Sequence, residues 1–179
     1  MLPPGHIAAG FLTAKALLHF THPNLNASQQ TQLLWWGMFF GFAPDLDSFI
    51  VFAKEKSFTF RNPEKNNHRR LTSHAPMLWM IVGLGVYFIS RSEYFRILGL
   101  LLWLCSWSHF ILDSIEYGIM WLWPFNKENW ALKDRGVGEK IEGKNFFDYW
   151  LNFLKFYASS WTFYVEIVLL ISVLFFIKF

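Results

Sequence analysis

The sequence predicts an all-α integral membrane protein, a polytopic helical bundle of about five helices of which four to five span the bilayer. Hydrophobic residues make up 54% of the 179 residues and charged residues only 16%, whereas an ordinary soluble domain is roughly a quarter charged. Aromatic residues reach 21%, including 10 Trp, and Trp and Tyr anchor at membrane interfaces. The length suits a single membrane-embedded domain over residues 1–179, and no strand-like alternation appears.

The predicted helices are apolar runs separated by polar turns, and they cover residues 5–20, 30–43, 76–90, 95–118 and 161–177. Pro3 and Pro4 suit the start of the first helix. The second run stops at "PDLD" and is too short to span a bilayer unless "SFIVFA" completes it. The third and fourth runs are better spans, and the fifth is the most lipid-like.

Two longer polar segments, 53–74 and 126–160, are predicted as loops. Each holds six Lys or Arg residues, whereas the turns on the opposite side hold few. Cytoplasmic loops of membrane proteins are enriched in Lys and Arg. The sequence therefore predicts that both loops and the N-terminus lie in the cytoplasm. The single cysteine, Cys105, excludes a disulfide framework.

Ionisable side chains end the fourth predicted helix, in "SWSHFILDSIEYG". His109, Asp113 and Glu116 follow one another at spacings of four and three, so they share one helix face. Charged groups at membrane depth are costly and mark functional sites. A local hydrogen-bonded pair of His109 and Asp113 is the simpler alternative. Glu116 is a candidate for orienting a ligand or acting as a general base.

The predicted topology brings seven candidate metal ligands to the same membrane face: His6, Asp45, Asp47, His68, His74, His109 and Asp113. Each has a simpler explanation when taken alone, such as a solvated helix end, a helix cap or an interfacial side chain. Together they indicate a metal site. Mixed imidazole and carboxylate donors suit zinc, manganese or iron, and this number of donors can hold one or two ions.

Two arginines are candidate catalytic residues beside these histidines, in "HRRLTSH". Arg69 and Arg70 can bind phosphate oxygens and stabilise negative charge. The alternative is that they only set the membrane topology or contact lipid headgroups.

Four motifs in order, "GHIAAGFLTAKAL", "GFAPDLDSF", "HRRLTSH" and "SHFILDSIEYGIMWLWPF", resemble the bacterial inner-membrane metal-dependent hydrolases of the LexA-regulated type. That family is distantly similar to the zinc-dependent phospholipase C and P1 nuclease group. The resemblance covers about two thirds of the chain and implies a helical membrane hydrolase. It implies His6, Asp45, His74, His109 and Asp113 as the first ligands, with His68 and Asp47 next.

The chain departs from the family pattern in its middle motif. Arg70 stands where the family usually has Gly, and His68 and His74 are six residues apart, one more than usual. The phospholipase group also has a later His-x-x-x-Glu pair, and this chain has no His after His109. The resemblance therefore implies one or two ions rather than three.

The function expected from the sequence is a membrane-bound metal-dependent hydrolase. Its substrate would be a phosphoester of a lipid or lipid-linked molecule at the cytoplasmic membrane face. The alternative is a non-catalytic metal-binding membrane protein with a structural or sensing role. A transporter ranks last, because the third and fifth helices carry almost no polar residues apart from Glu166. Membrane lipids are the expected partners, and no nucleic acid is expected.

Overall fold

The computed structural model describes residues 1–59, 67–133, 141 and 143–177, whose regular elements are helices, apart from one isolated β-bridge between Ile119 and Trp130. The five predicted helices are confirmed as helices, with bounds that shift by a few residues. They are α1 (Pro3–Thr21), α2 (Ala27–Phe42), α4 (Pro76–Ile89), α5 (Glu93–Asp113) and α7 (Trp161–Ile177).

Local chemistry fixes several helix ends. Prolines occupy the first turns of α1 and α4, where no backbone N–H is needed. Asn26 and Gln29 form a capping box at the start of α2, since the Asn26 side chain accepts from Gln29 N at 2.9 Å and the Gln29 side chain accepts from Asn26 N at 3.1 Å. His22 ends α1 in the left-handed conformation, with φ 43°.

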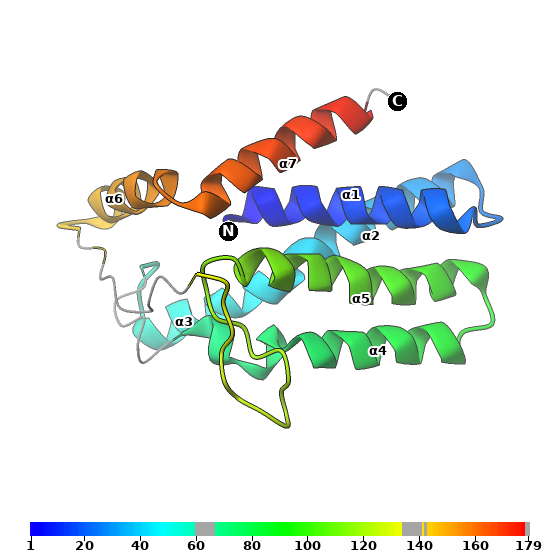
Figure 1. Cartoon of the computed structure of the whole chain (residues 1–179), viewed down its shortest axis with the longest axis horizontal. Coiled ribbons are helices and arrows are strands. Elements are labelled where there is room, and N and C mark those ends of the chain that lie inside the picture. The colour runs from blue at the N-terminus through cyan, green and yellow to red at the C-terminus, as the bar shows by residue number, and fades with distance from the viewer. Residues whose placement is uncertain (60–66, 134–140, 142, 178–179) are drawn as a thin grey trace.

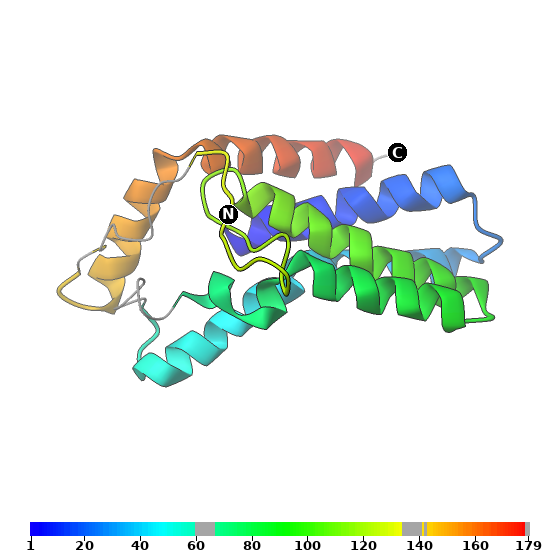
Figure 2. The same ribbon diagram turned by 60° about the horizontal axis from the view of Figure 1, so that its bottom comes forward.

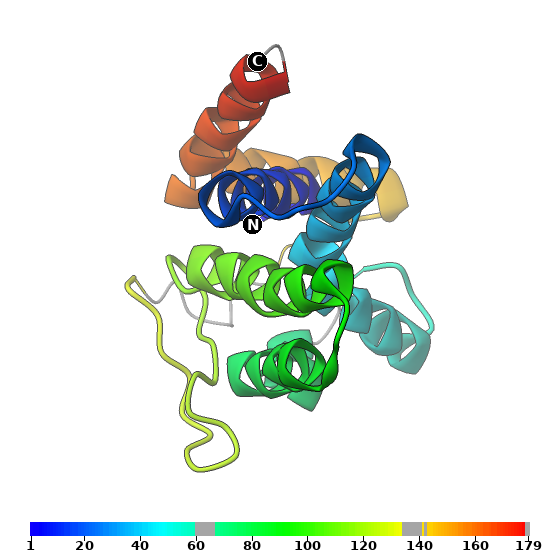
Figure 3. The ribbon, with the colours of Figure 1, turned by 90° about the vertical axis from the view of Figure 1, so that its right-hand side faces the viewer.

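The long helices run roughly along one axis (Figure 1). Seen from the end, α7, α1, α5 and α4 follow one another, and α2 lies against α1 and α5 (Figure 3). The buried core lies where α1, α2 and α5 meet, and it consists of Ala14, Leu33, Phe40, Ile97, Leu101 and Cys105. This packing brings the N-terminal end of α1 next to the C-terminal ends of α2 and α5.

Glycines bring α1 and α2 into close contact. A Cβ on Gly10 would overlap the backbone of Gly37, and a Cβ on Gly41 would overlap the backbone of His6 and Gly10. Small residues four apart allow such approaches between apolar helices. The start of α1 is thereby held against the end of α2.

The predicted loops contain more structure than expected. After α2, a 3₁₀ turn (Ala43–Asp47) leads into the short helix α3 (Ser48–Glu55), and two further turns, His68–Arg70 and Thr72–His74, precede α4. The segment 126–160 was expected to be a loop, but it contains α6 (Phe146–Ala158). Asn145 caps α6 by accepting from Asp148 N at 2.9 Å. Residues 60–66, 134–140 and 142 of these segments lie outside the described residues.

The helices α3 and α6 slant away from the bundle axis at the same end of the molecule (Figure 2). α6 meets α7 at 84° across a short break. The apolar side of α6 is open, and Phe147 is 80% exposed.

Among the described residues, α5 is long and apolar enough to cross a membrane, and the bent pair α6 and α7 passes the same test as one unit. α4 is apolar but has only 14 residues, fewer than the roughly 20 that a span needs. The prediction of four to five spans is therefore not confirmed.

Candidate metal centre

The candidate ligands gather at one end of the bundle, the end from which α3 and α6 project. His6 lies in the first turns of α1, and Asp45 lies in the 3₁₀ turn that follows α2. His74 precedes α4, while His109 and Asp113 lie one turn apart at the end of α5. These elements approach one another through the α1–α2 crossing and the α4–α5 pair. Four of the five side chains are fully buried, and Asp45 is 13% exposed.

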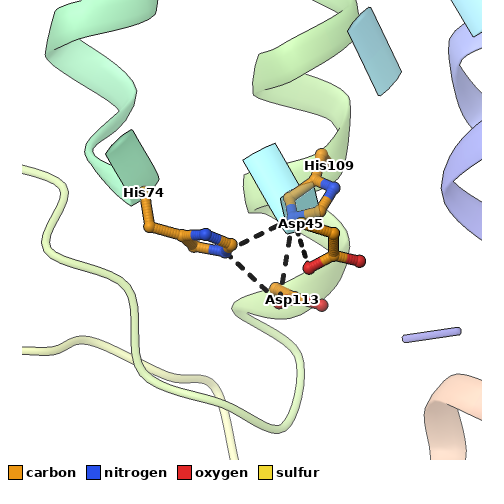
Figure 4. Close-up of side chains that lie close together, drawn as sticks. All are labelled: Asp45, His74, His109 and Asp113. Atoms are coloured by element: carbon orange, nitrogen blue, oxygen red, sulfur yellow. Dashed lines mark hydrogen bonds and ion pairs between the residues drawn. The ribbon is translucent and has the colours of Figure 1, made fainter. Parts of the chain in front are cut away.

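Four of these residues, Asp45, His74, His109 and Asp113, point toward a common centre, with ligand atoms that all lie within 4.8 Å of one another (Figure 4). The His74 and His109 Nε2 atoms are 3.4 Å apart. Asp45 Oδ1 is 3.6 Å from His109 Nε2, and Asp113 Oδ2 is 3.8 Å from His74 Nε2. Zinc bonds of about 2.0–2.2 Å in a tetrahedron place donor atoms roughly 3.3–3.6 Å apart. The four donors therefore fit a metal ion after small side-chain shifts.

The two central imidazoles are oriented by their other ring nitrogens. His109 Nδ1 is 2.9 Å from the Gly41 carbonyl oxygen, which can only accept, so Nδ1 carries the proton. His74 Nδ1 donates to Asp47 Oδ2 at 3.0 Å. Asp47 in turn accepts from Ser73 Oγ at 2.9 Å. This is the arrangement that surrounds metal-ligating histidines, and it leaves both Nε2 lone pairs facing the centre.

Charge around the centre favours a cation. Burial alone would lower the pKa of His74, but hydrogen bonds to Asp113 and Asp47 raise it to about 9. Burial alone would raise the pKa of Asp45, but the electrostatic interaction with His109 and a hydrogen bond from His68 hold it well below its usual range. Burial and the charge of Arg69 lower the pKa of His68. The carboxylates that hold a proton on His74 would equally attract a metal ion in its place.

His6 is packed against the centre without a hydrogen bond. Its ring is 0% exposed and stacks on the ring of His109, with centroids 3.7 Å apart and an interplanar angle of 24°. Neither ring nitrogen makes a hydrogen bond of acceptable geometry. Its Nε2 nevertheless lies 3.3 Å from Asp113 Oδ1 and 3.8 Å from Asp45 Oδ2.

His68 and Asp47 lie at the edge of the same cluster. His68 Nε2 is 3.6 Å from Asp45 Oδ1, and Asp47, His68 and His74 form a second group that could hold a metal ion. This group shares His74 with the first one. Because Asp47 accepts from His74 Nδ1, its present contact is that of an orienting residue.

The two arginines are placed differently. Arg69 Nε donates to Asp113 Oδ2 at 2.8 Å, and its guanidinium lies 4.3 Å from the centre of the Tyr117 ring. Arg70 is exposed beside it. The structure therefore brings Arg69 into the cluster and leaves Arg70 at the surface.

Glu116 lies apart from the metal cluster. It is fully buried, and its carboxylate accepts from Trp161 N at 2.9 Å and from Thr162 Oγ1 at 2.7 Å. Carboxylates at helix N-termini satisfy free N–H groups and the helix dipole. The contacts of Glu116 thus attach the start of α7 to the end of α5.

Some residues at the centre could not be predicted from the sequence. The Gly41 carbonyl and the Tyr117 ring contact His109 and Arg69 only because the helices fold together, and neither is marked by a motif. The Met1 ammonium is 2.8 Å from Asp113 Oδ1. The repeated "GxxxG" spacing of Gly37 and Gly41 was the available signal for a close helix crossing at this end.

No curated protein and no solved structure shows significant similarity to the chain. None of the comparisons supports similarity to a hydrolase or to the phospholipase C and P1 nuclease group. A family model described as YdjM inner membrane protein matches residues 1–179. The apolar span α5 and the exposed apolar residues of α7 accord with an inner-membrane location. The chain belongs to the YdjM inner membrane protein family.

Proposed function

We propose that this protein is a membrane-bound metal-dependent hydrolase that acts on a phosphoester of a lipid or lipid-linked substrate at the cytoplasmic membrane face. The observation that carries the proposal is the 3.4 Å distance between His74 Nε2 and His109 Nε2, which lie between the carboxylates of Asp45 and Asp113. Lone pairs that face each other beside negative charge require a cation between them. A divalent ion fits this requirement better than a single proton, since it uses all four donors at once.

The donor set suits zinc, manganese or iron(II), because it combines imidazole nitrogen with carboxylate oxygen and has no thiolate. Asp45, His74, His109 and Asp113 would hold the ion. When bound there, such an ion supplies Lewis-acid polarisation and lowers the pKa of a coordinated water.

The remaining residues position this set and supply positive charge. Asp47 fixes the ring of His74, and the Gly41 carbonyl fixes the ring of His109. Arg69 restrains Asp113 through Nε and has further N–H groups on its guanidinium that can bind a phosphate oxygen. Arg70, exposed on the same turn, adds positive charge at the approach to the site.

A lipid substrate is supported by the surroundings of the cluster. α6 has an exposed apolar side formed by Phe146, Phe147, Leu151 and Leu154, with Lys144 and Lys155 near its ends. Helices of this kind lie in the plane of the membrane interface. The 84° angle between α6 and the apolar α7 suits one helix in the interface and the other in the bilayer. The cluster lies at this end of the bundle, so an interfacial α6 would put it near the lipid phosphates.

The test is a hydrolysis assay with the full-length protein in detergent micelles and in anionic phospholipid vesicles. We expect phosphate-ester cleavage that a chelator abolishes and that zinc, manganese or iron(II) restores. A water-soluble phosphodiester should be cleaved far more slowly, because it is not concentrated at the membrane. Bound metal without cleavage of either class of phosphoester would overturn the hydrolase proposal.

That outcome would favour the second candidate function, a non-catalytic metal site. The observation in its favour is that Asp45, His74, His109 and Asp113 supply four protein donors. Four protein ligands fill a tetrahedral shell, as in structural zinc sites, whereas catalytic sites keep a position open.

Replacing Asp47 by Asn should weaken metal binding by roughly 10–100-fold, the usual cost of losing an outer-shell partner of a ligating histidine. The amide cannot accept as strongly from His74 Nδ1, so the ring loses its orientation. Titration of the chelator-treated protein with zinc measures the change. The matched control is Asp148→Asn, which changes a partly exposed carboxylate in the first turn of α6, away from the cluster, and this variant should bind zinc as the wild type does.

A further inference from the structure

We infer that His6, Asp45 and Asp113 form a second divalent-cation site, adjacent to the first and sharing both of its carboxylates. The inference rests on the proposed metal centre but not on hydrolysis. The second ion would lie on the α1 side of the cluster and would have three protein ligands.

The two carboxylates divide their oxygens between the two sides of the cluster. Asp113 turns Oδ1 toward His6 Nε2, at 3.3 Å, and Oδ2 toward the first centre, at 3.8 Å from His74 Nε2. Asp45 does the same, with Oδ2 at 3.8 Å from His6 Nε2 and Oδ1 at 3.6 Å from His109 Nε2. A carboxylate that presents one oxygen to each side is placed to bridge two ions.

His6 gives the independent reason for an ion on this side. It is fully buried, neither ring nitrogen is hydrogen-bonded, and its Nε2 faces two carboxylate oxygens. Buried polar groups are nearly always satisfied, so an orphaned imidazole requires an explanation. An ion bound by His6 Nε2, Asp113 Oδ1 and Asp45 Oδ2 would satisfy the ring nitrogen that faces the carboxylates.

The stacking of His6 on His109 sets the distance between the two proposed ions. The two ring centroids are 3.7 Å apart and the rings are nearly parallel. Paired metal ions in two-metal sites lie about 3.5–4 Å apart. Two imidazoles stacked at this distance can therefore each bind one ion of such a pair. Asp113 Oδ1 also accepts from the Met1 ammonium, but a carboxylate oxygen has a second lone pair for an ion.

The two sites would differ in the number of coordination positions that the protein leaves open. The first has four protein donors, while the second has three and keeps coordination positions for water or for an anionic oxygen of a substrate. With one imidazole and two carboxylates, the second site suits manganese, iron(II) or zinc. The open site resolves the difficulty that a closed four-donor centre poses for catalysis.

The experiment is manganese binding by the full-length protein in detergent, with stoichiometry and electron paramagnetic resonance measured on the same samples. We expect about two equivalents in the wild type and a spectrum of two spin-coupled ions. His6→Ala should bind about one equivalent and give the spectrum of an isolated ion. His19→Ala, which removes an exposed histidine from the other end of α1, should behave as the wild type does.

The possible outcomes separate this inference from the proposed function. One equivalent in the wild type, or two in His6→Ala, would overturn the second site and leave the first centre intact. No manganese, zinc or iron in the wild type would overturn both. If His6→Ala failed to fold, the wild-type spectrum would still test the second site. Two ions bridged by carboxylates give a spin-coupled spectrum, and a single ion does not.

Discussion

Replacement of both His109 and Asp113 by alanine is expected to reduce bound metal to background. The two residues supply two of the four donors at the first centre, and Asp113 also holds Arg69 and faces His6. Because the loss of outer-shell partners alone costs roughly 10–100-fold in affinity, the loss of two ligands should exceed that range. Elemental analysis of the purified protein measures it.

Metal should also stabilise the wild type and not this variant. A ligand that binds only the folded state stabilises it by about 2.7 kcal/mol at 100 times its Kd. The thermal midpoint of the wild type should therefore rise with added zinc and fall with a chelator, whereas that of the double variant should respond to neither. Since removal of Asp113 leaves the partly buried Arg69 without its carboxylate, Asp113→Asn with His109→Gln is the milder pair. Unchanged metal content in both pairs would contradict the proposed centre.

The second large effect is expected for Gly41→Ala. The added methyl group would overlap the backbone of His6 and Gly10, so α1 and α2 would have to separate. Overpacking of this kind costs about 1–3 kcal/mol. The separation would also move His6 and the carbonyl that orients His109. We expect a lower thermal midpoint together with weaker zinc binding.

Gly85→Ala is the matched control, because a Cβ at Gly85 would meet nothing within 4 Å. Alanine is favoured over glycine inside a helix by roughly 0.8–1.0 kcal/mol, so this variant should be as stable as the wild type or more so. The same Gly→Ala change is thus expected to lower the stability of the protein at position 41 and to maintain or raise it at position 85. A Gly41→Ala protein with wild-type stability and zinc affinity would show that α1 and α2 do not cross as closely as described.

The helices could be predicted from the sequence because apolar runs between polar turns determine them locally. The end of α5 was predicted too late, at residue 118, since the chain after Asp113 turns to carry Glu116 toward α7. α6 was missed although Asp148, Asn152 and Lys155 follow helical spacings of four and three, because the glycines and charged residues just before it suit a surface loop. Its helical state depends on the Asn145 cap and on packing of Tyr149 and Tyr157.

The cluster could be predicted in outline, because its ligands lie at helix ends that any up-and-down bundle brings to one side. The sequence does not predict which ring nitrogen of His74 or of His109 faces the centre. That choice depends on the hydrogen bonds that Asp47 and the Gly41 carbonyl make after folding. The different surroundings of Glu116 and Asp113 could not be predicted either. They share a helix face in the sequence, but α7 packs over only one of them.

All candidate ligands lie within the first 113 residues, and α7 joins through Glu116 and, near its other end, through Lys15 to the Phe176 carbonyl. Chains fold from the N-terminus as they are synthesised. The residues of the cluster can therefore come together while α6 and α7 are still being made. The last two helices join the bundle afterwards, so the cluster does not depend on them for any of its candidate ligands.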